Sequence, residues 1–152
     1  MEKLVRIHIT SIYGGLLPAR MALLHTDVVE SFYDIVRDVK KLKGKLIVSD
    51  MFRPWRAQLQ AWRKKPRLAV PPGRSYHEAG LAFDFDLSQI GMPLQKFYNI
   101  CSLHGWKPIF PRKDGLWIIK SKEAWHIQYD FHKIHYYTLQ AAIKDVGNWK
   151  TT

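Results

Sequence analysis

Four side chains from two distant stretches of the chain suit a divalent metal ion and its chemistry. His77 and Asp84 lie close together in the sequence, and His126 follows much later, three residues after Glu123. Catalytic zinc usually has three protein ligands from His, Asp, Glu or Cys and keeps a fourth position for water or substrate. The two histidines and Asp84 meet that count. Glu123 remains as a carboxylate that can act as general base, so the set predicts hydrolysis.

The hydropathy pattern around these residues predicts that they meet on a sheet. Residues 81–86 alternate between apolar and polar side chains, and residues 125–129 alternate in the same way. A period of two is typical of half-buried strands. Two such strands in one sheet would place Asp84 and His126 on a common polar face, with His77 supplied by the preceding loop. The apolar faces would then form the core.

The other histidines do not form such a pattern. A single histidine is more often a hydrogen-bonded structural residue than a metal ligand. We interpret four of them in this way: His25, His104, His132 and His135. Asp86 would share a strand face with Asp84, and two interpretations stay open for it. It either accepts a hydrogen bond from a ligand imidazole or belongs to the turn that follows the strand.

The two stretches together resemble the signature of the M15 zinc peptidases. The matching pattern is Ser75-x-His77-x-x-Gly80-x-Ala82-x-Asp84 followed by Glu123-x-Trp125-His126. This family includes VanY-like D-alanyl-D-alanine carboxypeptidases and phage endolysins, which cut the stem peptides of peptidoglycan, and it shares the hedgehog/DD-peptidase fold. The resemblance is strongest over residues 49–129. It implies one Zn2+ ion held by His77, Asp84 and His126, with Glu123 as the catalytic base.

The resemblance also implies residues that contact the substrate. Residues 49–53 and Gln58 resemble the family segment whose arginine stabilises the substrate carbonyl or the developing oxyanion, which assigns that catalytic role to Arg53. The expected substrate-binding residues are Ser75, Gln58, Tyr76 and Trp125. The sequence around residues 72–75 and 125–129 is more similar to the carboxypeptidase branch than to the endopeptidase branch. A D-alanyl-D-alanine carboxypeptidase is therefore the function that the resemblance favours.

Two alternatives stay within the same fold. One is a phage-type endolysin with L-alanyl-D-glutamate endopeptidase activity. The other is a non-enzymatic zinc-binding relative, against which Glu123 argues because a purely structural site has no use for a free base. A third hypothesis, a nucleic-acid binder, rests on charge alone, since the sequence carries no recognisable nucleic-acid recognition motif.

Composition indicates one folded domain with a strong positive charge. The chain has 152 residues, of which 47% are hydrophobic and 24% charged, in the range of a globular protein. We expect a single zinc peptidase domain over residues 1–152, as a monomer. The formal net charge is +11, which attracts anionic polymers in general, including those of cell walls, and predicts no specific nucleic acid.

The first eight residues are interrupted by charges and do not resemble a secretory signal. No stretch reaches the length of a transmembrane segment. We therefore expect a chain made in the cytoplasm that reaches its cell-wall substrate after lysis or by non-classical export.

The periodicity of the remaining sequence predicts the elements that would position the site. The expected strands cover residues 3–10, 45–49, the pair 106–110 and 116–119, and the two site strands. The expected helices cover residues 26–42 with Thr26 as N-cap, a segment from Pro54 with Trp55, Leu59 and Trp62 on one face, a segment from Pro93, and residues 133–146. Residues 64–74 are expected to form a loop that either borders the cleft or merely connects. Together these elements predict an α+β fold in which helices flank a central, mostly antiparallel sheet, with the zinc site on its open face.

Overall fold

The computed structural model describes residues 2–120 and 122–149, so the two ends of the predicted 1–152 domain lie outside the described residues. Its centre is an antiparallel sheet of four strands in the order β3-β4-β8-β5. These strands are β3 (Val48–Asp50), β4 (Ala82–Phe85), β8 (His126–Tyr129) and β5 (Trp106–Pro108). Two further pairs are antiparallel: β1 (Leu4–Arg6) with β2 (Leu23–His25), and β6 (Arg112–Lys113) with β7 (Leu116–Trp117).

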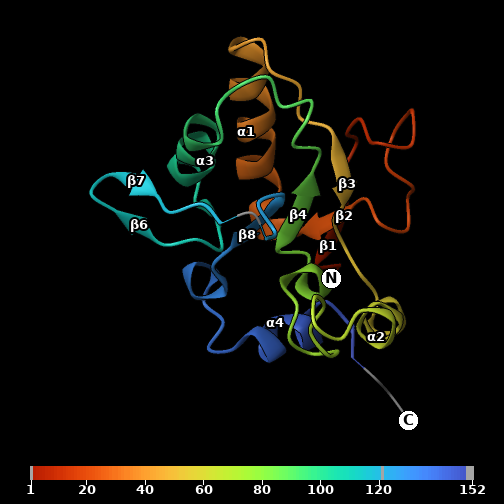
Figure 1. Ribbon diagram of the computed structural model, residues 1–152. Coiled ribbons are helices and arrows are strands. Elements are labelled where there is room, and N and C mark those ends of the chain that lie inside the picture. Colours follow the sequence, from red (N-terminus) through yellow and green to blue (C-terminus); the bar gives the residue numbers. More distant parts are fainter. Residues whose placement is uncertain (1, 121, 150–152) are drawn as a thin grey trace.

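The described helices flank the central sheet (Figure 1). They are α1 (Val29–Lys41), α2 (Trp55–Lys64), α3 (Leu94–Leu103) and α4 (Leu139–Asp145), with short 3-10 turns η1 (Thr26–Val28), η2 (Tyr76–Ala79) and η3 (Phe131–Ile134). The predicted α+β class, with helices around a mostly antiparallel sheet, is confirmed.

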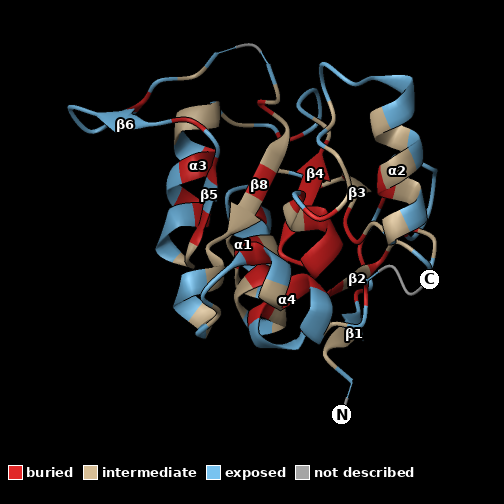
Figure 2. Ribbon diagram, turned by 90° about the horizontal axis from the view of Figure 1, so that it is seen from below, coloured by how far each residue is buried: buried red, intermediate tan, exposed pale blue. Residues whose placement is uncertain are grey.

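One face of the sheet packs against α1 and α3 and makes the core. The Phe83 ring lies 5.1 Å from that of Phe32 on α1, and the Phe85 ring lies 4.5 Å from that of Phe97 on α3. Figure 2 shows β4 fully buried within these layers. Because alternate residues of a strand point to opposite faces, Asp84 projects from the other side of the sheet.

The segment after α4 ties together the elements on that other side. The Asn148 amide accepts a hydrogen bond from the Trp55 backbone N–H at 2.8 Å and donates to the carbonyl oxygens of Arg53 and Glu78 at 3.0 and 2.9 Å. The start of α2 and the turn η2 are thereby held in a fixed relation beside β4.

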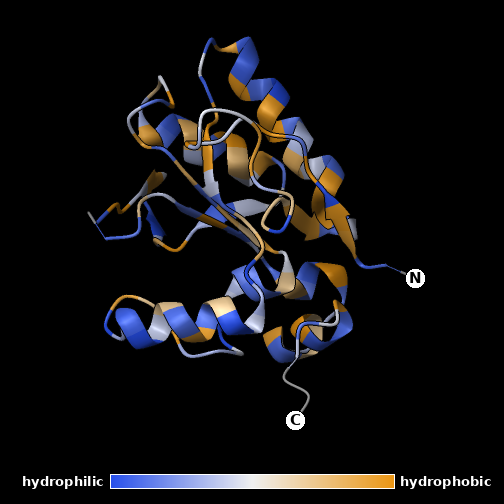
Figure 3. Ribbon diagram, turned by 90° about the vertical axis from the view of Figure 1, so that its right-hand side faces the viewer, coloured by the Kyte–Doolittle hydropathy of each residue, from blue (hydrophilic) through white to orange (hydrophobic). Residues whose placement is uncertain are grey.

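Helix α1 shows how the sequence pattern produces the core. Its buried residues, Phe32, Ile35 and Val39, recur at helical spacing, and hydrophilic and hydrophobic residues alternate along the helices in Figure 3. The prediction of Thr26 as N-cap was wrong, because a 3-10 turn precedes α1. The His25 side chain caps that turn by accepting a hydrogen bond from the Asp27 N–H.

Several predicted boundaries and one pairing were wrong. The predicted pair of residues 106–110 with 116–119 does not form, because β5 pairs with β8 and β7 pairs with β6. Residues 112–117 make a separate hairpin, in which Asp114 and Gly115 both have positive φ, as a tight hairpin turn requires. The opening strand is limited to Leu4–Arg6, and the predicted helix 133–146 is divided into η3 and α4 at His135, where φ is 70°.

Candidate metal centre

The register of the central sheet places the predicted ligands side by side. Asp84 on β4 lies directly opposite His126 on β8 and, on its other side, opposite Asp50 on β3. His77 comes from η2, the turn before β4, which ends at Gly80 with a φ of 68°. A Cβ at Gly80 would stand 2.7 Å from the His25 backbone nitrogen, so only glycine permits this close path.

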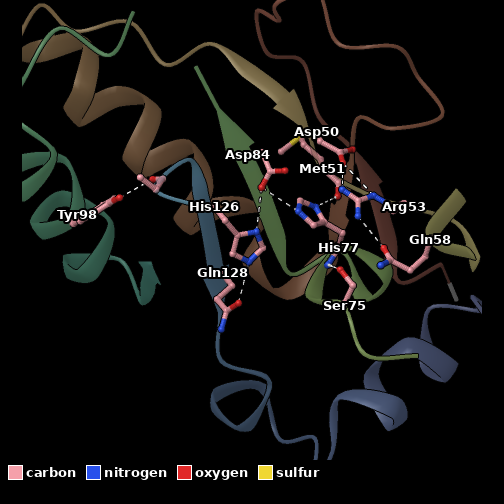
Figure 4. Close-up of polar contacts among 11 residues, drawn as sticks. Asp50, Met51, Arg53, Gln58, Ser75, His77, Asp84, Tyr98, His126 and Gln128 are labelled. Atoms are coloured by element: carbon pink, nitrogen blue, oxygen red, sulfur yellow. Dashed lines mark hydrogen bonds and ion pairs between the residues drawn. The ribbon is translucent and has the colours of Figure 1, made fainter. Parts of the chain in front are cut away.

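Three side chains converge on one point in front of the sheet (Figure 4). His77 Nε2 lies 3.1 Å from Asp84 Oδ1, and His126 Nδ1 lies 3.0 Å from the same oxygen. One ligand atom from each residue lies within 4.8 Å of the other two. Within residues 2–120 and 122–149, this is the one group of three or more such side chains arranged to hold a metal ion.

Each imidazole is oriented by a hydrogen bond on its far side. His77 Nδ1 donates to the Met51 carbonyl oxygen at 2.5 Å, and His126 Nε2 donates to Gln128 Oε1 at 3.0 Å. With the outer nitrogens protonated, the inner nitrogens present lone pairs to the point where the three groups meet. Metal-binding histidines are typically oriented in this way, so the donor set fits a metal ion.

The electrostatics of the cluster favour a cation. His77 and Asp84 are 3% and 9% exposed. Burial alone would raise the pKa of Asp84, but the charges and hydrogen bonds of His77 and His126 outweigh burial and lower the pKa well below its usual range. Burial lowers the pKa of His77, and the Asp84 carboxylate more than offsets it, so that this pKa is raised. A negative charge is therefore stabilised at a buried point between two imidazoles.

Arg53 lies beside the cluster and is held by two neighbours. Its Nε donates to the Asp50 carboxylate at 3.1 Å, its Nη2 donates to the same carboxylate, and its Nη1 donates to Gln58 Oε1 at 2.8 Å. A guanidinium has five N–H groups, and within residues 2–120 and 122–149 two of those of Arg53 have no acceptor.

Gln58 contacts both Arg53 and the loop that follows α2. Its side chain is 1% exposed, and besides accepting from Arg53 it donates to the Val70 carbonyl at 2.7 Å. Gln58 also lines the cleft, so its predicted contact with substrate stays a prediction. The expected apolar face of α2, formed by Trp55, Leu59 and Trp62, is only partly buried, and Gln58 is the one buried residue of that helix.

Glu123 stands on a tight turn just before β8. Its φ is 61°, an unusual value for a residue other than glycine, and its carbonyl accepts a hydrogen bond from the His126 N–H at 3.1 Å. The buried Tyr98 hydroxyl donates to the Ala124 carbonyl at 2.6 Å, which fixes the turn; burial raises the pKa of Tyr98 to about 12. Among the described residues the Glu123 carboxylate has no hydrogen bond or ion pair, and it lines the cleft that contains the cluster.

A cavity of about 540 Å³ contains the cluster and all the predicted site residues. Its lining includes the three candidate ligands, Arg53, Gln58, Ser75, Tyr76, Glu123 and Trp125, together with Gln128. This volume is typical of a ligand pocket. The Ser75 hydroxyl accepts a hydrogen bond from the His77 N–H at 3.2 Å as the cap of η2, and the Tyr76 ring packs against Phe131.

The open interpretation of Asp86 is resolved. Its carboxylate accepts hydrogen bonds from Ser88 and Gln89, so it is a turn residue, and the acceptor for His77 is the Met51 carbonyl instead.

The structural interpretation of His25 and His104 is confirmed. His25 donates to the Tyr136 hydroxyl, and His104 contacts Asp38. His132 and His135 are exposed residues outside the cleft, so the expectation that they are hydrogen-bonded within the fold receives no support.

Sequence reasoning missed four groups that support the site. Gln128 had a signal, because it lies two residues after His126 on the same strand face. Asp50 also had one, because it lies three residues before Arg53 in the segment 49–53 and pairs with it locally. Tyr98 had none, since its contact with Ala124 depends on tertiary packing. The fourth is the backbone carbonyl of Met51, which no side-chain pattern can reveal.

Comparisons with known proteins rest on structure. No protein-family model matches the sequence, and no curated protein matches it significantly. The LD-carboxypeptidase LdcB, whose structure concerns peptidoglycan recognition, superposes with a TM-score of 0.66 at 15% identity, covering 96% of this chain and 79% of that one. A mutant of the D,D-pentapeptidase VanY in complex with Zn(II) superposes with a TM-score of 0.57 at 16% identity, covering 93% of this chain and 84% of that one. This chain has the LdcB and VanY fold.

DacB from Streptococcus pneumoniae D39 has the same fold, with a TM-score of 0.52 at 16% identity over 91% of this chain and 79% of that one. The fold implied by the resemblance to the M15 peptidases is thus confirmed. Among the described residues, no helix combines the length and the apolar character needed to cross a membrane.

Proposed function

We propose that this protein is a zinc-dependent peptidase that hydrolyses peptidoglycan stem peptides, as a D-alanyl-D-alanine carboxypeptidase. The observation that carries the proposal is the convergence of His77, Asp84 and His126, with both imidazoles oriented by outer hydrogen bonds. Glu123, which has no partner among the described residues, lines the same cleft. The fold shared with LdcB and VanY supports it.

The donor set favours zinc among the common metals. Two imidazole nitrogens and one carboxylate oxygen suit zinc, and three protein ligands leave a position for the reaction. When bound, zinc would polarise the scissile carbonyl and make water a stronger acid.

The side chains of this chain divide the remaining steps between them. Glu123 removes a proton from the water that attacks the carbonyl carbon, and returns it to the amine nitrogen as the C–N bond breaks. The two free N–H groups of Arg53 stabilise the negative charge that develops on the carbonyl oxygen. Asp50 and Gln58 hold the guanidinium in the orientation that this requires.

The two alternatives differ in testable ways. A non-enzymatic metal site would gain nothing from a carboxylate that has no partner among the described residues and sits on a strained turn. An L-alanyl-D-glutamate endopeptidase would cut nearer the glycan and leave a different product. The carboxypeptidase is preferred because the sequence around Trp125 and His126 resembles that branch.

The test is identification of the products. Zinc-loaded protein is incubated with purified muropeptides that carry pentapeptide stems, and the products are analysed by mass spectrometry. We expect the loss of one D-alanine from each pentapeptide. Release from tetrapeptides would instead assign an L,D-carboxypeptidase, and a new amino-terminal D-glutamate would assign an endopeptidase. Absence of any cleavage would refute the proposal.

A further inference from the structure

The cleft that contains the metal centre has a second, cationic wall. The end of α2 and the loop after it contribute Lys64, Lys65 and Arg74 to the cavity lining. The apolar residues between them also line it, namely Leu68, Ala69 and Val70. Leu68 and Val70 are 38% and 41% exposed, so this wall offers apolar surface flanked by positive charge.

The three cations of this wall have no acidic partner among the described residues. Residues 51–77 contain seven Lys and Arg residues, and the carboxylates that flank this stretch are engaged elsewhere: Asp50 with Arg53, and Glu78 with the backbone N–H groups of Gly73 and Ser75. No ion pair joins Lys64, Lys65 or Arg74 to an acidic group among the described residues, whereas Arg53 is paired with Asp50. Interaction with the helix dipole accounts for a lysine at the end of α2. It does not account for Arg74, which lies on the loop and reaches the same cavity.

The loop of residues 65–74 is fixed to the rest of the fold by hydrogen bonds, so it forms a defined side of the cleft. The Val70 carbonyl accepts from Gln58 at 2.7 Å, and the Gly73 N–H donates to the buried Glu78 carboxylate at 2.9 Å. The residue next to Gly73 is Arg74, so its backbone is fixed where it enters the cavity.

We propose that Lys64, Lys65 and Arg74 form a subsite for a substrate carboxylate on the amino-terminal side of the scissile bond. This inference rests on the proposed function and names its substrate class. In a stem peptide with lysine at the third position, the free α-carboxylate of the γ-linked D-glutamate is the one carboxylate between the glycan and the scissile bond. The enzyme therefore prefers stems in which this group is not amidated.

The test compares two synthetic pentapeptides that are identical except for one group. Both have lysine at the third position, and one carries D-isoglutamate where the other carries D-isoglutamine. Binding to the zinc-loaded Glu123→Gln variant is measured by calorimetry, so that the peptides stay intact. We expect the carboxylate form to bind about tenfold more tightly, as a charge-assisted contact predicts. This preference falls as salt is added.

Variants assign the preference to the cationic wall. Replacing Lys64, Lys65 and Arg74 together by glutamine, in the Glu123→Gln background, reduces the preference to about twofold or less, as expected when these contacts are removed. A matched control replaces three exposed lysines outside the cavity by glutamine, namely Lys40, Lys41 and Lys45. This control should keep the preference for the carboxylate peptide.

Equal affinity for both peptides, or a preference that survives in the triple variant, would overturn the subsite. These outcomes are separable from failure of the proposed function. Hydrolysis by the wild-type protein without a carboxylate preference refutes only the subsite, and absence of hydrolysis refutes the proposed function while the binding comparison still decides the subsite.

Discussion

At the scale of single residues, the chemistry depends on where each side chain holds its proton. The outer nitrogens of His77 and His126 both donate to carbonyl oxygens, one from the Met51 backbone and one from the Gln128 side chain. The inner nitrogens are therefore available as ligands without any rearrangement. Glu123 stays unpaired among the described residues and is available as a base.

Gln128 supports the site through His126. Replacing it by alanine removes the acceptor for His126 Nε2, and we expect zinc affinity to fall about 10- to 100-fold, measured by competition with a chelator. A Gln128→Glu variant keeps an acceptor oxygen and should retain tight binding. Unchanged affinity in Gln128→Ala would show that this hydrogen bond does not orient the ligand.

The backbone conformation of Glu123 lowers the stability of the fold. Its positive φ costs a residue other than glycine free energy. Glu123→Gly and Glu123→Ala should both abolish hydrolysis, because both remove the carboxylate. The free energy of unfolding should be about 0.5 to 1 kcal/mol higher for the glycine variant than for the alanine variant. Urea denaturation of the two variants measures this difference. If the alanine variant were the more stable of the two, the backbone strain inferred here would be absent.

The sequence was sufficient for the site residues whose roles lie in their side chains and spacing. His77, Asp84, His126 and Glu123 form a recognisable pattern, and the structure places all four in one cleft. The sequence could not reveal the role of the Met51 carbonyl, because a backbone group has no side-chain signature. Nor could it reveal that Gln58 is buried, because that burial results from contacts with Arg53 and with the loop at Val70.

At the scale of elements, the turn before α1 depends on a neutral histidine. His25 is fully buried; its Nδ1 accepts from the Asp27 N–H at 3.1 Å, and its Nε2 donates to the Tyr136 hydroxyl at 2.7 Å. That hydroxyl in turn donates to Asp145. Protonation of Nδ1 would remove the acceptor of the Asp27 N–H. The same ring holds Tyr136 through Nε2, so its protonation state affects both η1 and the segment that contains Tyr136.

The protein should lose stability as pH falls because of this histidine. Burial lowers the pKa of His25 below its usual value near 6.5, so below that value the unfolded chain binds a proton that the folded one does not. The free energy of unfolding of the wild type should therefore fall more between pH 7.5 and 5.5 than that of His25→Gln. Urea titrations at both pH values check this, and equal pH dependence would show that His25 titrates alike in both states.

Local elements could be predicted from local signals, whereas non-local pairing could not. The helical spacing of the apolar residues of α1 was visible in the sequence. The pairing of β5 with β8 was missed because the strands that follow β5 were closer in sequence. Burial of Trp106 against α1, where its indole N–H donates to the Ser31 hydroxyl at 2.9 Å, places β5 at the sheet edge.

At the scale of the whole molecule, the ion would join three separate parts of the fold. His77 precedes β4, Asp84 lies on it, and His126 lies on β8. A metal that binds only the folded chain stabilises it by mass action.

Zinc should therefore raise the stability of the wild-type protein by about 2.7 kcal/mol when the free ion is at 100 times its Kd. Thermal unfolding with zinc or with a chelator measures the change in Tm. Asp84→Asn, which replaces the one charged ligand, should show a much smaller shift. A shift of equal size in that variant would place the bound ion elsewhere.

The most direct test measures zinc content and D-alanine release together in three proteins. We predict one zinc per chain and release of D-alanine for the wild type, one zinc and no release for Glu123→Gln, and neither zinc nor release for His126→Ala. Wild-type turnover by the zinc-loaded Glu123→Gln variant, or a wild-type protein that binds no stoichiometric zinc, would contradict the account.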